Sequence, residues 1–135
     1  MAGHYIDKKI YYHDTDAGGV VYYANYLEHL EEARFEFCLS KGVSMVESAK
    51  EGAIFPVVHL EIDYKSPARY GDVIRIFTEI EKIGFSSIHF LQEIKKEDLT
   101  LIKAKTVWAC VNGALKPIAI PDKIKRLLKI EKDIL

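Results

Sequence analysis

The sequence has no excess of either charge and no long hydrophobic run. Lysine and arginine total 19 against 20 aspartate and glutamate, a formal net charge of -1, so no overall positive field favours nucleic acid or an anionic membrane. Apolar runs such as residues 18–24 are far shorter than the roughly 18 to 20 residues that cross a bilayer. No apolar segment typical of a signal peptide follows Met1. These absences predict a cytoplasmic protein with no nucleic-acid partner and no membrane insertion.

Cysteine is scarce, and so are side-chain amides. Cys38 falls in a predicted helix and Cys110 in a predicted strand, and their spacing fits no zinc or redox motif. We expect both thiols to be reduced, buried and unreactive. Asn25, Gln92 and Asn112 are the only amide side chains, whereas Lys, Glu and Ile are abundant, a bias that hyperthermophile proteins share.

The chain is expected to form a single domain over residues 1–135, because its length suits one core and no repeat or linker interrupts it. Residues 6–12 predict a first strand, and turn-forming residues follow at 14–19. Apolar residues then recur at steps of three and four from Tyr23 onward, which predicts a long helix that ends near residues 41–42. Asn25 and Glu28 resemble a capping box at its start. Residues 43–51 predict a short second helix.

The period changes to two in the second half of the chain. Apolar and polar residues alternate over 58–65, 74–81, 88–94 and 102–110, with turn-forming residues between the segments. The pattern predicts four half-buried strands joined as consecutive hairpins in an antiparallel sheet. Pro121 opens a predicted terminal helix that continues beyond Glu131. Only the long helix could cover one face of the five-stranded sheet, so the fold class is α+β.

Residues 11–23 concentrate acids, glycines and a histidine between the first strand and the long helix. Backbone N–H groups at a helix start are unpaired and partly positive, so they can hold a carbonyl oxygen or a developing oxyanion. The paired glycines Gly18 and Gly19 allow a ligand to approach the backbone. Ordinary loops and caps contain the same residue types. Composition therefore leaves a site and a plain connecting loop as alternatives.

Other chemistries lack their motifs in this sequence. His13, Asp14 and Asp16 offer metal-binding atoms, but no second histidine follows at helical spacing and no calcium loop is present. We expect no metal. The sequence also contains no Gly-x-Ser-x-Gly elbow and no phosphate-binding loop, and neither cysteine lies beside a base.

Arg34 falls within the apolar stripe of the predicted helix, which predicts that it is buried. A buried guanidinium needs a partner, and Glu31, one turn earlier, is the nearest candidate. A structural salt bridge is favoured over direct catalysis. His29, His59 and His89 have no partner in the local sequence and are interpreted as ordinary surface or packing residues.

Residues 12–26 and 31–34 resemble the hot-dog-fold acyl-CoA thioesterases of the 4-hydroxybenzoyl-CoA thioesterase family, and most of all the branch associated with the Tol-Pal system. Residues 66–72 match the family's loop before its third strand. The resemblance covers nearly the whole chain and implies a curved five-stranded antiparallel sheet wrapped around a long central helix, with a C-terminal helix. It also implies a homodimer joined edge to edge, paired again into a tetramer, with active sites between subunits.

The resemblance assigns roles to individual residues. The family's catalytic carboxylate aligns with Asp16, its carbonyl-polarising backbone N–H with Tyr23, and its close-approach glycine with Gly19. Phe55, Pro56 and Val57 match a stretch that contacts the acyl or pantetheine portion of the substrate. Supporting positions are His13, Glu31 and Arg34. The sequence departs from the branch at His13, often Glu there, and at Tyr23, often His; residues 84–86 also lack the basic residues that meet nucleotide phosphates in some relatives.

The implied reaction is hydrolysis of an acyl-CoA or related pantetheine thioester to a free acid and a thiol. Asp16 would attack the carbonyl carbon or activate water, while the Tyr23 N–H polarises the carbonyl. No cofactor is implied, since CoA is part of the substrate. Two alternatives stay open: a module that binds acyl-CoA or an acyl carrier without cleaving it, and a hot-dog dehydratase, whose paired His and acid would be His13 and Asp14.

Overall fold

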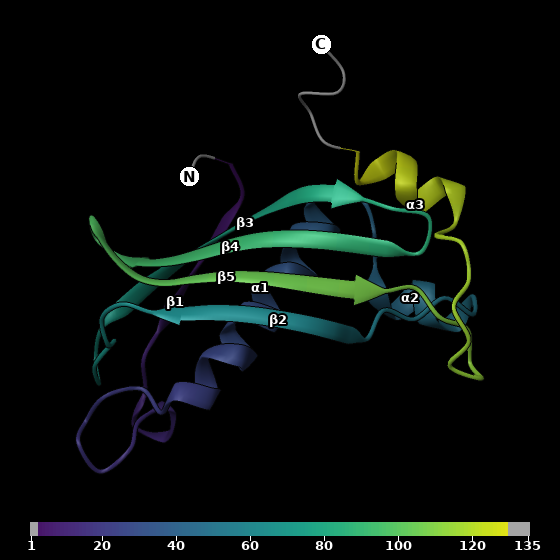
Figure 1. Ribbon diagram of the computed structural model, residues 1–135. Helices are drawn as coiled ribbons and strands as arrows, with labels where there is room; N and C mark the ends of the chain where they lie inside the picture. Colours follow the sequence, from purple (N-terminus) through teal and green to yellow (C-terminus); the bar gives the residue numbers. More distant parts are fainter. Residues whose placement is uncertain (1–2, 130–135) are drawn as a thin grey trace.

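The computed structural model describes residues 3–129 and shows a curved antiparallel sheet with one long helix lying along a face of it (Figure 1). The strands are β1 (Tyr5–Lys9), β2 (Val57–Tyr64), β3 (Val73–Ile83), β4 (Ser87–Lys96) and β5 (Leu99–Ala109). The helices are α1 (Tyr26–Ser40), α2 (Met45–Lys50) and α3 (Asp122–Leu127), and short 3-10 turns occupy Tyr12–Asp14 (η1) and Tyr23–Asn25 (η2). This is the hot-dog architecture that the resemblance implied.

The order of the strands differs from a series of consecutive hairpins. The sheet runs β1-β3-β4-β5-β2, so β3, β4 and β5 form the expected hairpins but β2 does not pair with β3. Instead β2 pairs antiparallel with β5, from Val57 opposite Trp108 to Tyr64 opposite Ile102. The chain crosses between β2 and β3 through residues 65–72. As a result, the outer side of β2 is a free edge of the sheet within the described residues.

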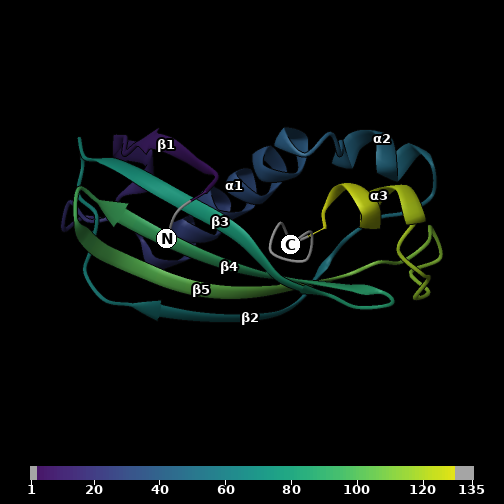
Figure 2. The same ribbon diagram turned by 90° about the horizontal axis from the view of Figure 1, so that it is seen from above.

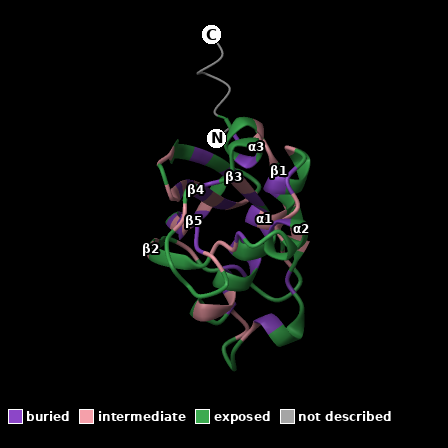
Figure 3. Ribbon diagram, turned by 90° about the vertical axis from the view of Figure 1, so that its right-hand side faces the viewer, coloured by how far each residue is buried: buried purple, intermediate pink, exposed green. Residues whose placement is uncertain are grey.

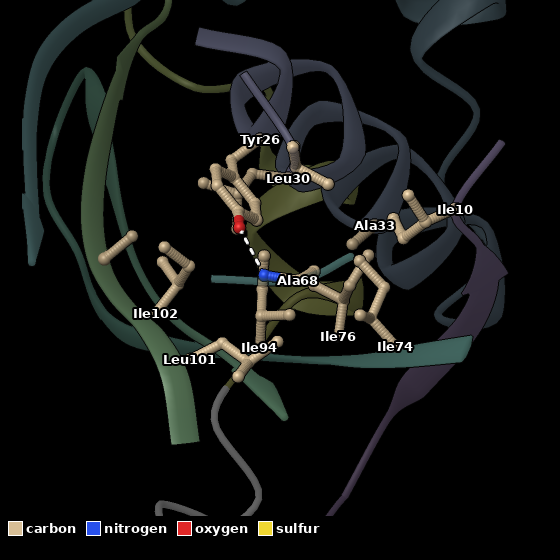
Figure 4. Close-up of a cluster of buried hydrophobic side chains, with 12 residues drawn as sticks. Ile10, Tyr26, Leu30, Ala33, Ala68, Ile74, Ile76, Ile94, Leu101 and Ile102 are labelled. Atoms are coloured by element: carbon tan, nitrogen blue, oxygen red, sulfur yellow. Dashed lines mark hydrogen bonds between the residues drawn. The ribbon is translucent and has the colours of Figure 1, made fainter. Parts of the chain in front are cut away.

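The core lies between α1 and the sheet, where Figure 3 shows the buried residues gathered. The first half of α1 packs Tyr26, Leu30 and Ala33 against isoleucines of β3 and β4 (Figure 4). The second half packs Phe37 and Cys38 against a cluster that α2 and α3 help to enclose at the far end of the sheet (Figure 2). The periodicity of the long helix therefore predicted its buried stripe.

The ends of several elements differ from the sequence expectations. β1 ends at Lys9 rather than residue 12, because η1 follows, and α1 begins at Tyr26 after η2. The predicted capping box is wrong: Asn25 has helical backbone angles (φ -71, ψ -19) and makes no side-chain cap. Its Nδ2 donates instead to the Asp14 carbonyl at 2.9 Å. The part of the terminal helix predicted beyond Glu131 lies outside the described residues.

Both cysteines are free and buried, as expected. Burial raises the pKa of Cys38 to about 12, with the nearby Arg34 charge acting in the opposite direction. Burial also raises the pKa of Cys110. Among the described residues, no helix combines the length and the apolar character needed to cross a membrane.

Candidate active site

Asp16 lies at the tip of a closed turn between β1 and α1. Thr15 forms an antiparallel bridge with Val21, and the Asp16 N–H donates to the Val20 carbonyl at 2.9 Å. Asp16 Oδ1 accepts the Gly18 N–H at 2.8 Å. The Asp16 side chain is exposed, and its Oδ2 makes no hydrogen bond within residues 3–129. The turn thus presents one anchored, solvent-facing carboxylate.

Gly19 has a positive φ of +78, which only glycine adopts without strain, and a Cβ added there would meet nothing within 4 Å in this chain. The positive φ at position 19, and not a lack of space within the chain, therefore explains why this position needs glycine. The open space beside Gly19 also leaves its backbone accessible to a ligand. The Gly19 carbonyl accepts the Tyr70 N–H at 3.1 Å from the β2–β3 crossover, which supports the turn from below.

The Tyr23 backbone N–H is the free donor on the other side of this turn. The neighbouring Tyr22 N–H donates to the Asp14 carbonyl at 3.0 Å, and the Asn25 N–H donates to Tyr22 at 2.8 Å. The Tyr23 N–H itself donates to no acceptor in the described part of the chain. The Tyr23 carbonyl, in the following peptide, accepts the Tyr64 hydroxyl from the end of β2 at 3.2 Å. A substrate carbonyl could therefore accept this N–H.

Asp14 and His29 form a buried pair beneath the turn. Asp14 is only 3% exposed and His29 only 5%, and His29 Nε2 lies 3.2 Å from Asp14 Oδ1. The expectation that His29 is an ordinary surface or packing residue without a partner is therefore wrong, because Asp14, fifteen positions earlier, and Glu32, one helical turn later, both lie beside its ring. His13 is exposed, stacks on Tyr11 and lies 3.8 Å from Asp14 Oδ1. A substrate could not reach Asp14 without displacing these neighbours.

His59 and His89 are not part of this cluster. His59 is exposed on β2 beside Glu61, and His89 lies half-buried on β4 near Ser87, so both agree with the interpretation as surface or packing residues. Within residues 3–129, no three His, Cys, Asp or Glu side chains are grouped so that they could hold a metal ion.

A second group of predicted residues lines a cavity of about 190 Å³ beside the middle of α1. Glu31, Arg34, Phe55 and Val57 line it, while Pro56 is exposed next to them. The remaining lining residues are Phe35, Met45, Ile54 and Trp108. The cavity is mostly apolar, with a carboxylate and a guanidinium in its wall, which is the composition typical of a small-molecule pocket.

Arg34 is buried but does not form the predicted salt bridge with Glu31, because Glu31 is exposed and no Arg34–Glu31 contact within 4 Å exists in the described structure. Arg34 Nη1 donates to Gln92 Oε1 at 3.0 Å and, weakly, to Thr106 Oγ1 at 3.5 Å. The guanidinium also lies 5.8 Å from the centre of the Trp108 ring. Burial lowers the pKa of Arg34 to about 10, so the group stays charged at neutral pH.

One chain does not bring the two groups together. Val57 begins β2 at the cavity, whereas Tyr64 ends β2 next to Tyr23. The strand spans eight residues, or roughly 23 Å at about 3.3 Å per residue. Figure 1 shows the turn at one end of α1 and α2 at the other. Asp16 and the cavity therefore do not adjoin within one protomer.

With this fold and geometry, the comparisons identify a class of protein. A family model described as the thioesterase-like superfamily matches residues 11–128, and the chain belongs to that superfamily. It is 38% identical over 119 residues to the acyl-CoA thioesterase YbgC of Haemophilus influenzae, covering 87% of this chain and 88% of that protein. It is 35% identical over 130 residues to the acyl-CoA thioesterase YbgC of Helicobacter pylori, covering 89% and 96%. The association with the Tol-Pal system stays a prediction.

Solved structures agree with this membership. A hypothetical protein from Aquifex aeolicus superposes with a TM-score of 0.89 at 29% identity, covering 94% of this chain and 100% of that one. A probable thioesterase from Bartonella henselae superposes with a TM-score of 0.83 at 34% identity, covering 89% and 100%. The hot-dog fold is therefore shared with a probable thioesterase that matches this chain over most of its length.

Proposed function

We propose that the protein hydrolyses acyl-CoA thioesters to a free acid and CoA. The observation that carries the proposal is the exposed Asp16 carboxylate in the same turn as the unoccupied Tyr23 N–H, in a chain whose curated relatives are acyl-CoA thioesterases. The substrate carbonyl would accept the Tyr23 N–H, and a donor placed in this way is worth about 3 kcal/mol in the transition state.

Asp16 acts in the proposed mechanism as nucleophile or as general base. As nucleophile, its oxygen attacks the thioester carbon and expels the thiolate, and water then hydrolyses the anhydride. As general base, it takes a proton from the water that attacks the same carbon. A thiolate is a good leaving group, so neither path needs a strong general acid, a metal or another cofactor.

The proposed active site forms between two copies of the chain. The acid and the cavity do not adjoin in one protomer, whereas a partner joined at the free edge of β2 could place its own acid beside this cavity. Exposed apolar side chains at that edge, Val57 and Val58, also favour a homodimer. A further pairing into a tetramer and a cytoplasmic location are proposed from the family resemblance.

Replacing Asp16 by Asn tests the proposed function. We expect Asp16→Asn to keep its fold and to lower kcat at least about a hundredfold for a panel of acyl-CoAs, measured by release of free thiol. Cys38 and Cys110 are buried, so a thiol reagent reports CoA rather than protein. Asp98→Asn, in the exposed β4–β5 turn, is the matched control. Thiol release by Asp16→Asn at the wild-type rate would exclude both roles of Asp16, and no release by the wild type would favour a binding module.

A further inference from the structure

We propose that the buried Asp14–His29 pair positions the catalytic turn, holding Asp16 and the Tyr23 N–H at a fixed separation. The inference rests on the proposed function, because it assigns a role in the same reaction. Neither side chain is accessible to a substrate, so His29 and Asp14 are positioning residues and not catalytic ones. Four independent contacts of Asp14 support this assignment.

Asp14 is bonded to both halves of the turn. Its Oδ2 accepts the Tyr11 N–H at 2.9 Å, at the end of the segment that follows β1. Its carbonyl accepts the Tyr22 N–H at 3.0 Å and Asn25 Nδ2 at 2.9 Å, both from the segment that leads into α1. Asp14 precedes Asp16 by two positions, and Tyr22 immediately precedes Tyr23. Any movement of Asp14 therefore shifts the acid relative to the amide.

His29, on α1, contacts the Asp14 side chain in the turn. It projects from α1, a rigid element, and its Nε2 lies 3.2 Å from Asp14 Oδ1. Its Nδ1 lies 3.5 Å from Glu32 Oε1, which in turn lies 3.0 Å from Lys8 Nζ on β1. Each ring nitrogen thus lies within 3.5 Å of a carboxylate oxygen.

The geometry explains why this pair is needed. A carboxylate that is almost completely buried requires compensating donors, and the Tyr11 N–H supplies only one. The His29 contact has the distance of a hydrogen bond, although neither ring N–H points directly at a carboxylate oxygen. The 3.2 Å approach of His29 Nε2 to Asp14 Oδ1 is therefore a buried polar contact that packs the ring against the carboxylate. His13, whose Nε2 lies 3.8 Å from Asp14 Oδ1, is exposed and cannot replace it as a rigid support.

The experiment removes the imidazole and then returns it. We expect His29→Ala to lower kcat about tenfold to a hundredfold with KM nearly unchanged, since a misplacement of about 1 Å can cost a hundredfold in rate. Added imidazole, filling the buried space left by the side chain, should restore a large part of kcat. It should not restore Asp16→Asn. His89→Ala on β4, far from the turn, is the matched control and should keep the wild-type kcat with or without imidazole.

A second variant guards against a failure to fold. His29→Phe fills a similar buried volume without ring nitrogens, and thermal denaturation shows whether each variant is folded at the assay temperature. A folded His29→Phe or His29→Ala with wild-type kcat would overturn the inference, as would a loss of kcat that imidazole does not restore. If wild-type protein cleaves acyl-CoA and Asp16→Asn does not, the proposed function stands whatever the His29 variants do.

Discussion

At the scale of single residues, the buried Arg34 guanidinium needs hydrogen-bond acceptors inside the core, and a small polar network supplies them. Gln92 connects it: its Oε1 accepts Arg34 Nη1 at 3.0 Å, while its Nε2 donates to the Leu30 carbonyl at 2.9 Å and to Thr78 Oγ1 at 3.1 Å. Arg34 Nε has no hydrogen-bond partner among the described residues. The buried guanidinium therefore depends on Gln92 more than on any other side chain.

Two substitutions measure this dependence. Gln92→Leu should lower the free energy of unfolding by about 2 to 4 kcal/mol, because it removes an acceptor from a buried charge and the side-chain hydrogen bonds to the Leu30 carbonyl and to Thr78. Thr106→Val removes only the 3.5 Å contact and should cost less than about 1 kcal/mol. Urea denaturation of both variants checks the contrast, and equal losses would show that Gln92 has no special part in supporting the charge.

Contacts between single side chains were also the feature of the structure that the sequence predicted least well. Burial of Arg34 follows from its place in the apolar stripe of α1, but its partners Gln92 and Thr106 lie 58 and 72 positions later. The same limit applies to His29. A local pattern predicts which face of a helix a side chain occupies. It does not predict which distant strand or loop will pack against that face and supply the partner.

At the scale of elements, β2 carries the surface that a second copy would cover. Its burial pattern is almost entirely exposed, unlike the alternating patterns of β3 and β5. Val58, at the irregularity in the pairing with β5, is 60% exposed. Exposed apolar edges of this kind invite the addition of another strand, and a lysine in such an edge usually prevents it.

The edge predicts the behaviour of one variant. Val58→Lys should convert the proposed dimer into monomers at micromolar concentration, because pairing would bury two unmatched charges. Analytical ultracentrifugation of the wild type and the variant provides the measurement. Leu99→Lys, which replaces another exposed apolar residue beside the β4–β5 turn, is the control. If Val58→Lys keeps the mass of the wild-type assembly, the dimer interface lies on another surface.

At the scale of the whole molecule, local periodicity predicted the helices and strands but not how the strands are arranged. Alternation identifies a strand and its buried face, and that information is the same whichever neighbour the strand takes. The eight residues between Tyr64 and Val73 gave no sign that the chain crosses to the far edge of the sheet. For the site, the motif predicts the acid turn, while the distance between turn and cavity depends on how α1 and β2 lie across the folded sheet.

Mixing two inactive variants tests whether the site is divided between copies. Asp16→Asn lacks the acid, and Ile54→Trp, at a lining residue outside β2, should fill the cavity with its larger side chain. After the two are denatured together and refolded in equal amounts, half of the dimers contain one of each, and each such dimer has one intact site. We expect about a quarter of the wild-type activity to return. A mixture that stays inactive would mean that each chain uses its own acid and cavity.

Trp108, the one tryptophan in the sequence, lies in the wall of the cavity with the Phe55 ring 5.7 Å away. Its indole emission therefore reports on that end of each protomer, without an attached label. An acyl group entering the cavity would change the emission of this indole. Binding and bond cleavage can thus be followed by two separate optical signals, one from the protein and one from the released thiol.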